Sequence, residues 1–182
     1  MMMLSSLLPR TVVMTGLAAW MTIAVLNNLT DQGTNLANLE TMLTMRLLSE
    51  DQVLGNGLEW RAWGSGSTAS VLYCVIAWQL ATAAALWWGA AAHLRALLGN
   101  GGTGEAATAA SIALSMFAAM WLVFLCGGLW FGYWIKQGPI QGVHFTLLIL
   151  SVVCMLLVNQ PVGAAASAQR DRRDAERNPV TS

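Results

Sequence analysis

Four apolar stretches, at about residues 11–29, 68–92, 109–134 and 143–158, take up most of this 182-residue chain. A helix needs roughly 20 apolar residues to cross the hydrocarbon of a bilayer, and each stretch comes near that length. The stretches lack the alternation of apolar and polar residues that marks a strand. Backbone polar groups in lipid must be paired internally. The sequence therefore predicts an all-α fold, a four-helix transmembrane bundle.

The composition is that of a membrane protein. Hydrophobic residues make up 56% of the chain and charged residues only 10%, which is too apolar a balance for an ordinary soluble domain of this size. The formal net charge is zero, and the chain shows no motif of a nucleic-acid-binding fold, so the lipid bilayer is expected as a partner and nucleic acid is not. We predict one membrane domain over residues 1–162 and a flexible tail over residues 163–182.

The basic residues are distributed unevenly about the four stretches. By the positive-inside bias, the side with more Lys and Arg near the spans faces the cytoplasm. We therefore expect both termini and the second loop in the cytoplasm, and the first and third loops outside. Six basic residues fall on the expected inner side and three on the outer side, namely Arg10, Arg95, Arg170, Arg172, Arg173 and Arg177 against Arg46, Arg61 and Lys136.

The first stretch shares one feature with a secretory signal peptide, because residues 1–10 end in an arginine and precede an apolar run. No small-x-small cleavage site precedes residues 27–28, and the apolar run is long for a signal peptide. We interpret this stretch as a retained transmembrane helix.

The first outer loop, residues 30–67, is the longest connection between stretches. Leu36, Leu39, Leu43 and Leu47 recur at spacings of three and four residues, which predicts an amphipathic helix over about residues 35–50, capped by Thr34 or Asn35. Such a helix would lie on the membrane surface or roof the bundle, and we favour the roof.

Small residues suggest where the helices pack. Apolar burial does not drive association in lipid, so close approach at small residues matters more. Two series recur every fourth residue and predict a shared contact, and a GxxxG pattern near the outer end of the third stretch packs within the bundle or against another protein. These residues are Ala77, Ala81, Ala85 and Gly89, then Ser111, Ser115 and Ala119, and the GxxxG residues Gly128 and Gly132.

The chain lacks the patterns of a catalytic or metal site. Ionisable residues are almost absent from the four stretches, and His93 and His144 fall near opposite ends of the bundle, so they do not suit a shared haem. Three cysteines, Cys74, Cys126 and Cys154, lie within the stretches, with Cys74 and Cys126 both in the outer half. We expect no enzyme, no metal and no cofactor, while quinone binding stays open.

Polar and aromatic residues gather at the expected outer surface. Trp60, Arg61 and Trp63 suggest anchoring at the interface, with Arg61 paired to a loop carboxylate or a lipid phosphate, or contact with a partner. Pro139 is expected to end the third span. Lys136 is expected to reach the outer headgroups, and the alternative is a ligand site that it shares with His144.

Three segments resemble a known family. They are residues 27–31 (NNLTD), residues 60–62 (WRA) and residues 126–139 (CGGLWFGYWIKQGP). Together they are similar to a bacterial family of predicted small integral membrane proteins without an assigned function, over about residues 11–161. The resemblance implies a four-span protein of the bacterial cytoplasmic (inner) membrane and implies no activity. A looser likeness to claudin-type tetraspans conflicts with the lack of paired loop cysteines.

Two functional hypotheses remain. The first is a non-enzymatic subunit or interaction protein of a larger membrane assembly, which contacts another membrane protein through the outer loop and the end of the third helix. The alternative is a small transporter or ligand-binding membrane protein with a site under the outer loop, formed by Arg61, Lys136 and His144. The candidate contact residues are Trp60, Arg61, Gly128, Trp130, Gly132, Lys136 and His144.

Overall fold

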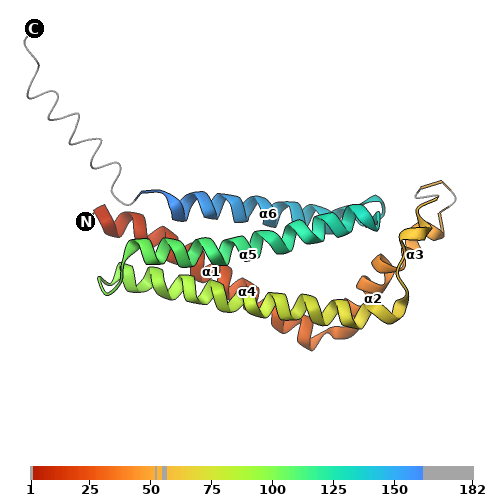
Figure 1. Ribbon diagram of the computed structural model, residues 1–182, viewed down its shortest axis with the longest axis horizontal. Coiled ribbons are helices and arrows are strands. Elements are labelled where there is room, and N and C mark those ends of the chain that lie inside the picture. The colour runs from red at the N-terminus through yellow and green to blue at the C-terminus, as the bar shows by residue number, and fades with distance from the viewer. Residues whose placement is uncertain (1, 52, 55–56, 162–182) are drawn as a thin grey trace, which may run out of the picture.

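The computed structural model describes residues 2–51, 53–54 and 57–161. Four long helices dominate this part of the chain, α1 (Met2–Thr30), α4 (Thr68–Leu97), α5 (Thr103–Trp130) and α6 (Gly138–Asn159), and it contains no strand (Figure 1). Each of the four is long and apolar enough to cross a membrane. The predicted all-α bundle with four spans is confirmed. The expected tail, residues 163–182, lies outside the described residues.

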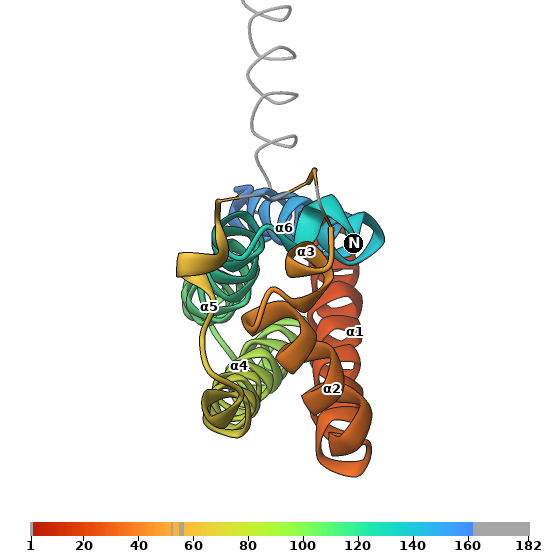
Figure 2. The same ribbon diagram turned by 90° about the vertical axis from the view of Figure 1, so that its right-hand side faces the viewer.

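The helices pack in chain order. α4 lies between α1 and α5, and α6 packs against α5, so that the four form the bundle seen end-on in Figure 2. The beginning of α1 and the end of α6 lie at the same end (Figure 1). There the buried Arg10 donates hydrogen bonds to the carbonyls of Val158, at 3.3 Å, and Gln160, at 2.8 Å. This places a guanidinium on the negative end of α6.

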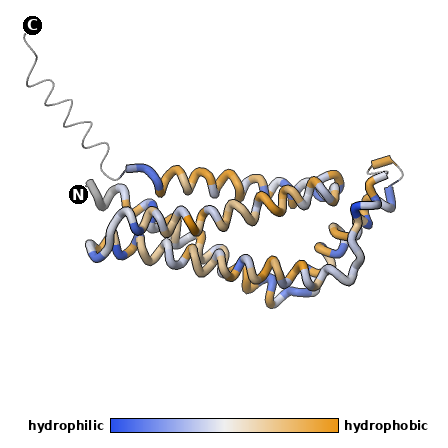
Figure 3. The backbone as a smooth tube through the Cα atoms, in the orientation of Figure 1, coloured by the Kyte–Doolittle hydropathy of each residue, from blue (hydrophilic) through white to orange (hydrophobic). Residues whose placement is uncertain are grey.

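Apolar residues run along all four long helices, while polar residues gather at the α4–α5 turn and around the loop between α1 and α4 (Figure 3). We call this loop the outer loop, and its end of the bundle the outer end, after the side expected from the sequence. The central core contains Met14, Met21, Leu86, Leu114 and Phe117, each fully buried. The outer half adds an aromatic group in which Trp121 contacts Trp20, Phe117, Phe124 and His144.

The predicted small-residue contact between α4 and α5 is wrong for three of its seven members. Gly89 is buried, and a Cβ placed on it would lie 3.3 Å from Cα of Ala110, so this glycine does permit close approach. Ala77 and Ala81 are exposed, however, as is Ser115. A step of four residues advances about 400° around a helix with 3.6 residues per turn, so such a series drifts away from one face.

The outer loop contains two short α-helices, α2 (Gln32–Leu43) and α3 (Arg46–Ser49), and two 3-10 turns, η1 (Glu59–Arg61) and η2 (Ser65–Ser67). The single helix predicted over residues 35–50 is broken at Met45, which has a left-handed φ of 52°. The N-cap is Asp31, not Thr34 or Asn35.

The predicted roof over the bundle is present. α2 and α3 lie across its outer end (Figure 2). Their buried residues Leu43, Met45 and Leu48 form a cluster with Phe131, which follows α5. The chain around α2 and α3 therefore packs on the end of the bundle.

The turn between α5 and α6 differs from the prediction. α5 ends at Trp130, and Gly132 adopts a left-handed φ of 62° before the turn η3 (Tyr133–Ile135). Pro139 stands in the first turn of α6 and does not end the third span. A proline is favoured at that position because its missing N–H has no partner to lose there.

Candidate functional site

The seven candidate contact residues all belong to the outer end of the bundle. Trp60 and Arg61 lie in η1, Gly128 and Trp130 in the last turn of α5, Gly132 and Lys136 in the connection around η3, and His144 in the second turn of α6. The fold thus brings together two segments separated by about 70 residues of sequence. Their side chains nevertheless divide into an exposed group and a buried group.

Trp60, Arg61 and Trp130 form the exposed group. The two indole rings meet edge to face with centroids 5.6 Å apart, and Cζ of Arg61 lies 5.2 Å from the centroid of each. Nη1 of Arg61 also donates to the backbone carbonyl of Trp130 at 3.4 Å. Trp60 is 70% exposed and Trp130 46%. A cation between two aromatic faces is held by the ring quadrupoles, so these three side chains brace one another.

The neighbouring Trp63 packs on the next residue of the α5 end. Its ring lies edge to face with Phe131, with centroids 5.4 Å apart, and its backbone N–H donates to the backbone carbonyl of Leu43 at 2.8 Å. Trp60 and Trp63 do not share a helical face, because the backbone is extended at Ala62. Successive indoles of the loop therefore contact successive residues, Trp130 and Phe131, where α5 ends.

The two glycines of the GxxxG pattern pack within the chain. The pattern is not a helical stripe, since α5 ends at Trp130 and Gly132 lies beyond it. A Cβ at Gly128 would stand 2.1 Å from Oε1 of Gln141 and 2.7 Å from Cε1 of Tyr133. A Cβ at Gly132 would stand 2.8 Å from Cδ1 of Leu48. The lack of a side chain at Gly128 leaves room for Gln141 in the first turn of α6, and the lack of one at Gly132 leaves room for Leu48 of α3.

Lys136 points to the outer loop, and not to lipid headgroups as expected. Its ammonium forms an ion pair with the carboxylate of Asp51, which also accepts the N–H groups of Val53 and Leu54 at 2.8 Å each. The hydrogen bond from Lys136, reinforced by those two backbone bonds, holds the pKa of the Asp51 carboxyl well below its usual range. Asp51 is thus a link between the roof and the α5–α6 connection.

His144 faces the interior of the bundle. The Tyr133 hydroxyl lies 2.7 Å from Nδ1 and donates to it when that nitrogen carries no proton. The imidazole also stacks on Trp121, with centroids 5.6 Å apart. Burial raises the pKa of Tyr133 to about 12, because the phenolate would lose its hydration. The Tyr133–His144 contact joins the connection to α6.

The three residues of the alternative hypothesis therefore have separate partners. Arg61 contacts Trp60 and Trp130, Lys136 pairs with Asp51, and His144 contacts Tyr133. The structure does not gather them around one space.

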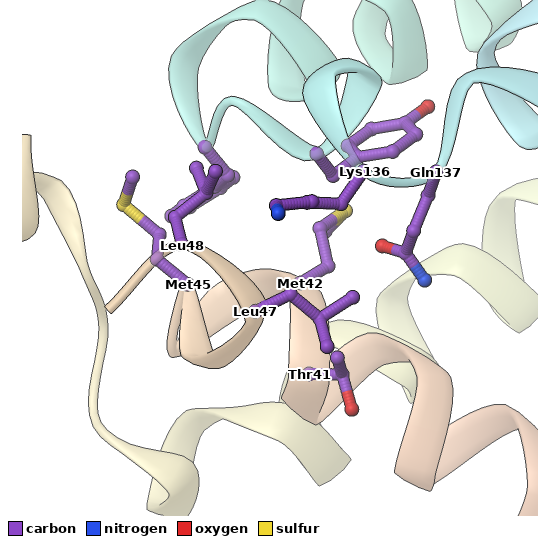
Figure 4. A pocket seen from close by; sticks show the side chains of 9 residues that line it. Thr41, Met42, Met45, Leu47, Leu48, Lys136 and Gln137 are labelled. Carbon is purple, nitrogen blue, oxygen red and sulfur yellow. The ribbon is translucent and has the colours of Figure 1, made fainter. Parts of the chain in front are cut away.

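A small hollow does lie beneath the roof, between α2, α3 and the α5–α6 connection (Figure 4). Its volume of about 10 Å³ leaves room for no more than about one water molecule. Lys136 and Gln137 reach toward it from the connection. Nine residues line it, namely Thr41, Met42, Met45, Leu47, Leu48, Phe131, Tyr133, Lys136 and Gln137.

Sequence reasoning missed Asp51 and Tyr133. The first loop has five acidic residues, and the sequence does not show that one of them would pair with Lys136, which was expected at the outer headgroups. Tyrosine is a residue type that often anchors helices at the membrane interface, and nothing in the spacing of Tyr133 from His144 indicated a hydrogen bond between them. The three cysteines are free, with Cys154 buried and both Cys74 and Cys126 exposed.

Comparison with known proteins gives one match. No curated protein and no solved structure matches the chain significantly. Residues 6–161 match the family described as predicted small integral membrane protein (DUF2165). That range holds nearly all of the described structure, with the four candidate spans, the roof and the α5–α6 connection. The resemblance noted from the sequence is thereby confirmed, and the chain belongs to the DUF2165 family of small integral membrane proteins.

Proposed function

We propose that this integral membrane protein is a non-enzymatic subunit or interaction protein of a larger membrane assembly, and that it binds another membrane protein at its outer end. The observation that carries this proposal is a group of exposed apolar side chains in the first outer loop, Val53, Leu54, Trp60 and Trp63, which we call the outer apolar surface. They are 80%, 45%, 70% and 49% exposed. Exposed apolar groups of this kind mark contact sites.

The position of this surface distinguishes it from the lipid-facing sides of the helices. All four residues precede α4, and the loop around α3 projects past the outer ends of α5 and α6 (Figure 1). Val53 and Leu54 precede the candidate span Glu59–Leu97, so the acyl chains around the spans do not cover these two side chains. A protein partner would remove these side chains from water.

The outer apolar surface is also held in place before any partner arrives. Trp60 packs on Trp130, and Trp63 packs on Phe131. The carboxylate of Asp51 accepts the backbone N–H groups of Val53 and Leu54 and forms an ion pair with Lys136. Preorganised contact residues lose less conformational entropy on binding, and tryptophan is the residue type most enriched among those that dominate binding energy.

Charge narrows the chemistry of the partner. The outer loop carries Asp31, Glu40, Glu50 and Glu59, and within the described residues none of these four forms an ion pair. A loop that carries unpaired carboxylates and exposed apolar side chains favours a partner whose outer face has basic side chains beside apolar ones. We expect association to weaken as salt is added.

The same proposal includes sidedness. The excess of basic residues near α1, the α4–α5 turn and the C-terminal segment supports both termini in the cytoplasm. The resemblance of residues 27–31, 60–62 and 126–139 to a bacterial family supports the inner membrane. A fluorescent protein that folds only in the cytoplasm, fused to the C-terminus, is expected to fluoresce. A dark fusion at normal expression would contradict the orientation.

The test is cross-linking in native membranes followed by purification in a mild detergent. We expect a second protein to co-purify with the wild type and to be lost from a Val53→Ser, Trp60→Ser double variant. Trp88→Ser is the matched control, since Trp88 is 45% exposed on α4 toward the opposite end. Recovery of monomer alone, or equal capture by wild type and double variant, would contradict the proposal.

A further inference from the structure

Arg61 differs from the other cations of the described chain in its partners. Lys136 pairs with Asp51, Arg95 pairs with Glu105 at 3.3 Å, and Arg10 donates to two carbonyls at the end of α6. Arg46 is exposed on α3 and donates to the Thr41 hydroxyl. Arg61 is partly buried, and its one hydrogen bond within the described residues is the long contact, 3.4 Å, with the carbonyl of Trp130.

The surroundings of Arg61 increase its need for an anion. Two indole rings, at 5.2 Å each, replace water beside the guanidinium, and Nε is buried without a partner. Within the described residues Arg61 forms no salt bridge with a carboxylate. A guanidinium that has lost part of its hydration gains more from an anionic oxygen than one that is fully solvated.

The depth of Arg61 indicates which anion is available. Trp130, whose carbonyl accepts from Arg61, is the last residue of the candidate span Thr103–Trp130. The guanidinium therefore lies where hydrocarbon gives way to headgroups, the level at which Trp side chains concentrate. The anionic oxygens that every phospholipid places at this level are those of its phosphate diester.

We propose that Arg61, flanked by Trp60 and Trp130, binds the phosphate of an outer-leaflet phospholipid. The free N–H groups of the guanidinium donate to phosphate oxygens, and the two indoles pack against the glycerol and the first acyl carbons. This site lies beside the spans and does not depend on the protein partner proposed above, although Trp60 contributes to both surfaces.

The experiment uses the full-length protein in mild detergent, with native mass spectrometry and thermal unfolding as readouts. Phosphatidylglycerol is added to the wild type and to Arg61→Gln. We expect bound phospholipid and a raised Tm for the wild type, and affinity about tenfold weaker for Arg61→Gln, which corresponds to the loss of one charge-assisted hydrogen bond. Arg46→Gln is the matched control and is expected to bind as the wild type does.

Two further additives identify the source of the anion. Diacylglycerol with the same acyl chains lacks the phosphate and is expected to give no shift in Tm. Inorganic phosphate at the same concentration is expected to give none either, since it brings no apolar part to the indoles. An equal shift with diacylglycerol would overturn phosphate recognition, and an equal shift with inorganic phosphate would overturn the lipid assignment.

The variants supply the remaining outcomes. Equal binding by the wild type and Arg61→Gln would overturn the proposal. If Arg61→Gln does not fold, Arg61→Lys and Trp60→Leu take its place, and weaker phospholipid binding by both is expected. Undiminished lipid binding by those two variants, or an Arg61 that cross-links to a protein carboxylate in native membranes and excludes lipid, would also overturn it.

Discussion

Asp51 and Lys136, which are 85 positions apart in the sequence, form an ion pair that joins the first outer loop to the connection between α5 and α6. The pair is partly exposed, so its attraction is moderated by solvent. The pair still matters for the geometry of the loop, because Asp51 also accepts hydrogen bonds from the backbone of Val53 and Leu54 and so fixes their position. The outer apolar surface is thereby tied to the bundle.

The Asp51–Lys136 pair predicts a dependence of stability on acid. Folding lowers the pKa of Asp51 below the value of about 4 that the carboxyl has in an unfolded chain. The pair therefore contributes fully to the stability of the fold above about pH 4, and this contribution is lost as the pH falls further. Thermal unfolding of the wild type and Asp51→Asn should therefore differ at pH 7 and converge in acid. Glu50→Gln is the neighbouring control, and a difference that stayed constant with pH would exclude this role.

Gly128 is predicted to be intolerant of a side chain. Gly128→Ala places a methyl group into Gln141 and Tyr133, and such overpacking costs about 1–3 kcal/mol. Gly127→Ala is the matched control, since a Cβ there meets nothing within 4 Å. Denaturation in detergent should separate the two variants, and equal stability would show that the α5–α6 contact is looser than described.

Arg10 is predicted to stabilise the fold by joining α1 to the end of α6. Arg10→Met removes hydrogen bonds to the carbonyls of Val158 and Gln160, and loss of charge-assisted bonds of this kind costs about 1.5–3 kcal/mol. Arg95→Met serves for comparison, because the Arg95–Glu105 pair is more than half exposed and should contribute about 0.2–1 kcal/mol. A larger loss for Arg95→Met than for Arg10→Met would refute this assignment.

Tyr133 is predicted to titrate late. Burial raises its pKa to about 12, against about 10 for an exposed phenol. Folding favours the neutral phenol, so stability is unaffected below about pH 10 and falls as the pH rises from there through 12. The phenolate absorbance of the wild type minus that of Tyr133→Phe isolates this group. A difference curve with its midpoint near 10 would mean that Tyr133 is exposed.

The sequence was sufficient to predict the architecture, because a membrane span can be recognised from the length and the low polarity of its segment alone. The four spans and the roofing helix follow from these properties and from leucine spacing. The contact faces did not follow, since a repeat of four residues cannot show which side of α4 meets α5. Ala77 and Ala81, for example, are exposed.

The order of the four spans predicted that the first loop and the end of α5 lie at the same end of the bundle, and the structure joins them through Trp60 and Trp130. The sequence did not predict which side chains contact one another there. The breaks at Met45 and Gly132 are set by left-handed backbone positions that depend on tertiary packing. The direction of His144 depends on how α6 packs against α5, and the sequence spacing does not give that packing.

The most direct measurement of the central claim is photo-cross-linking in native membranes, with a photoreactive aromatic residue placed at position 60. A control chain carries the same group at position 88, which is also an exposed tryptophan but belongs to α4. We predict that the photoreactive residue at position 60 forms one discrete cross-link to another protein, and that the same residue at position 88 does not. Adducts to lipid alone from both positions, with the protein correctly folded, would contradict an interaction role at the outer surface.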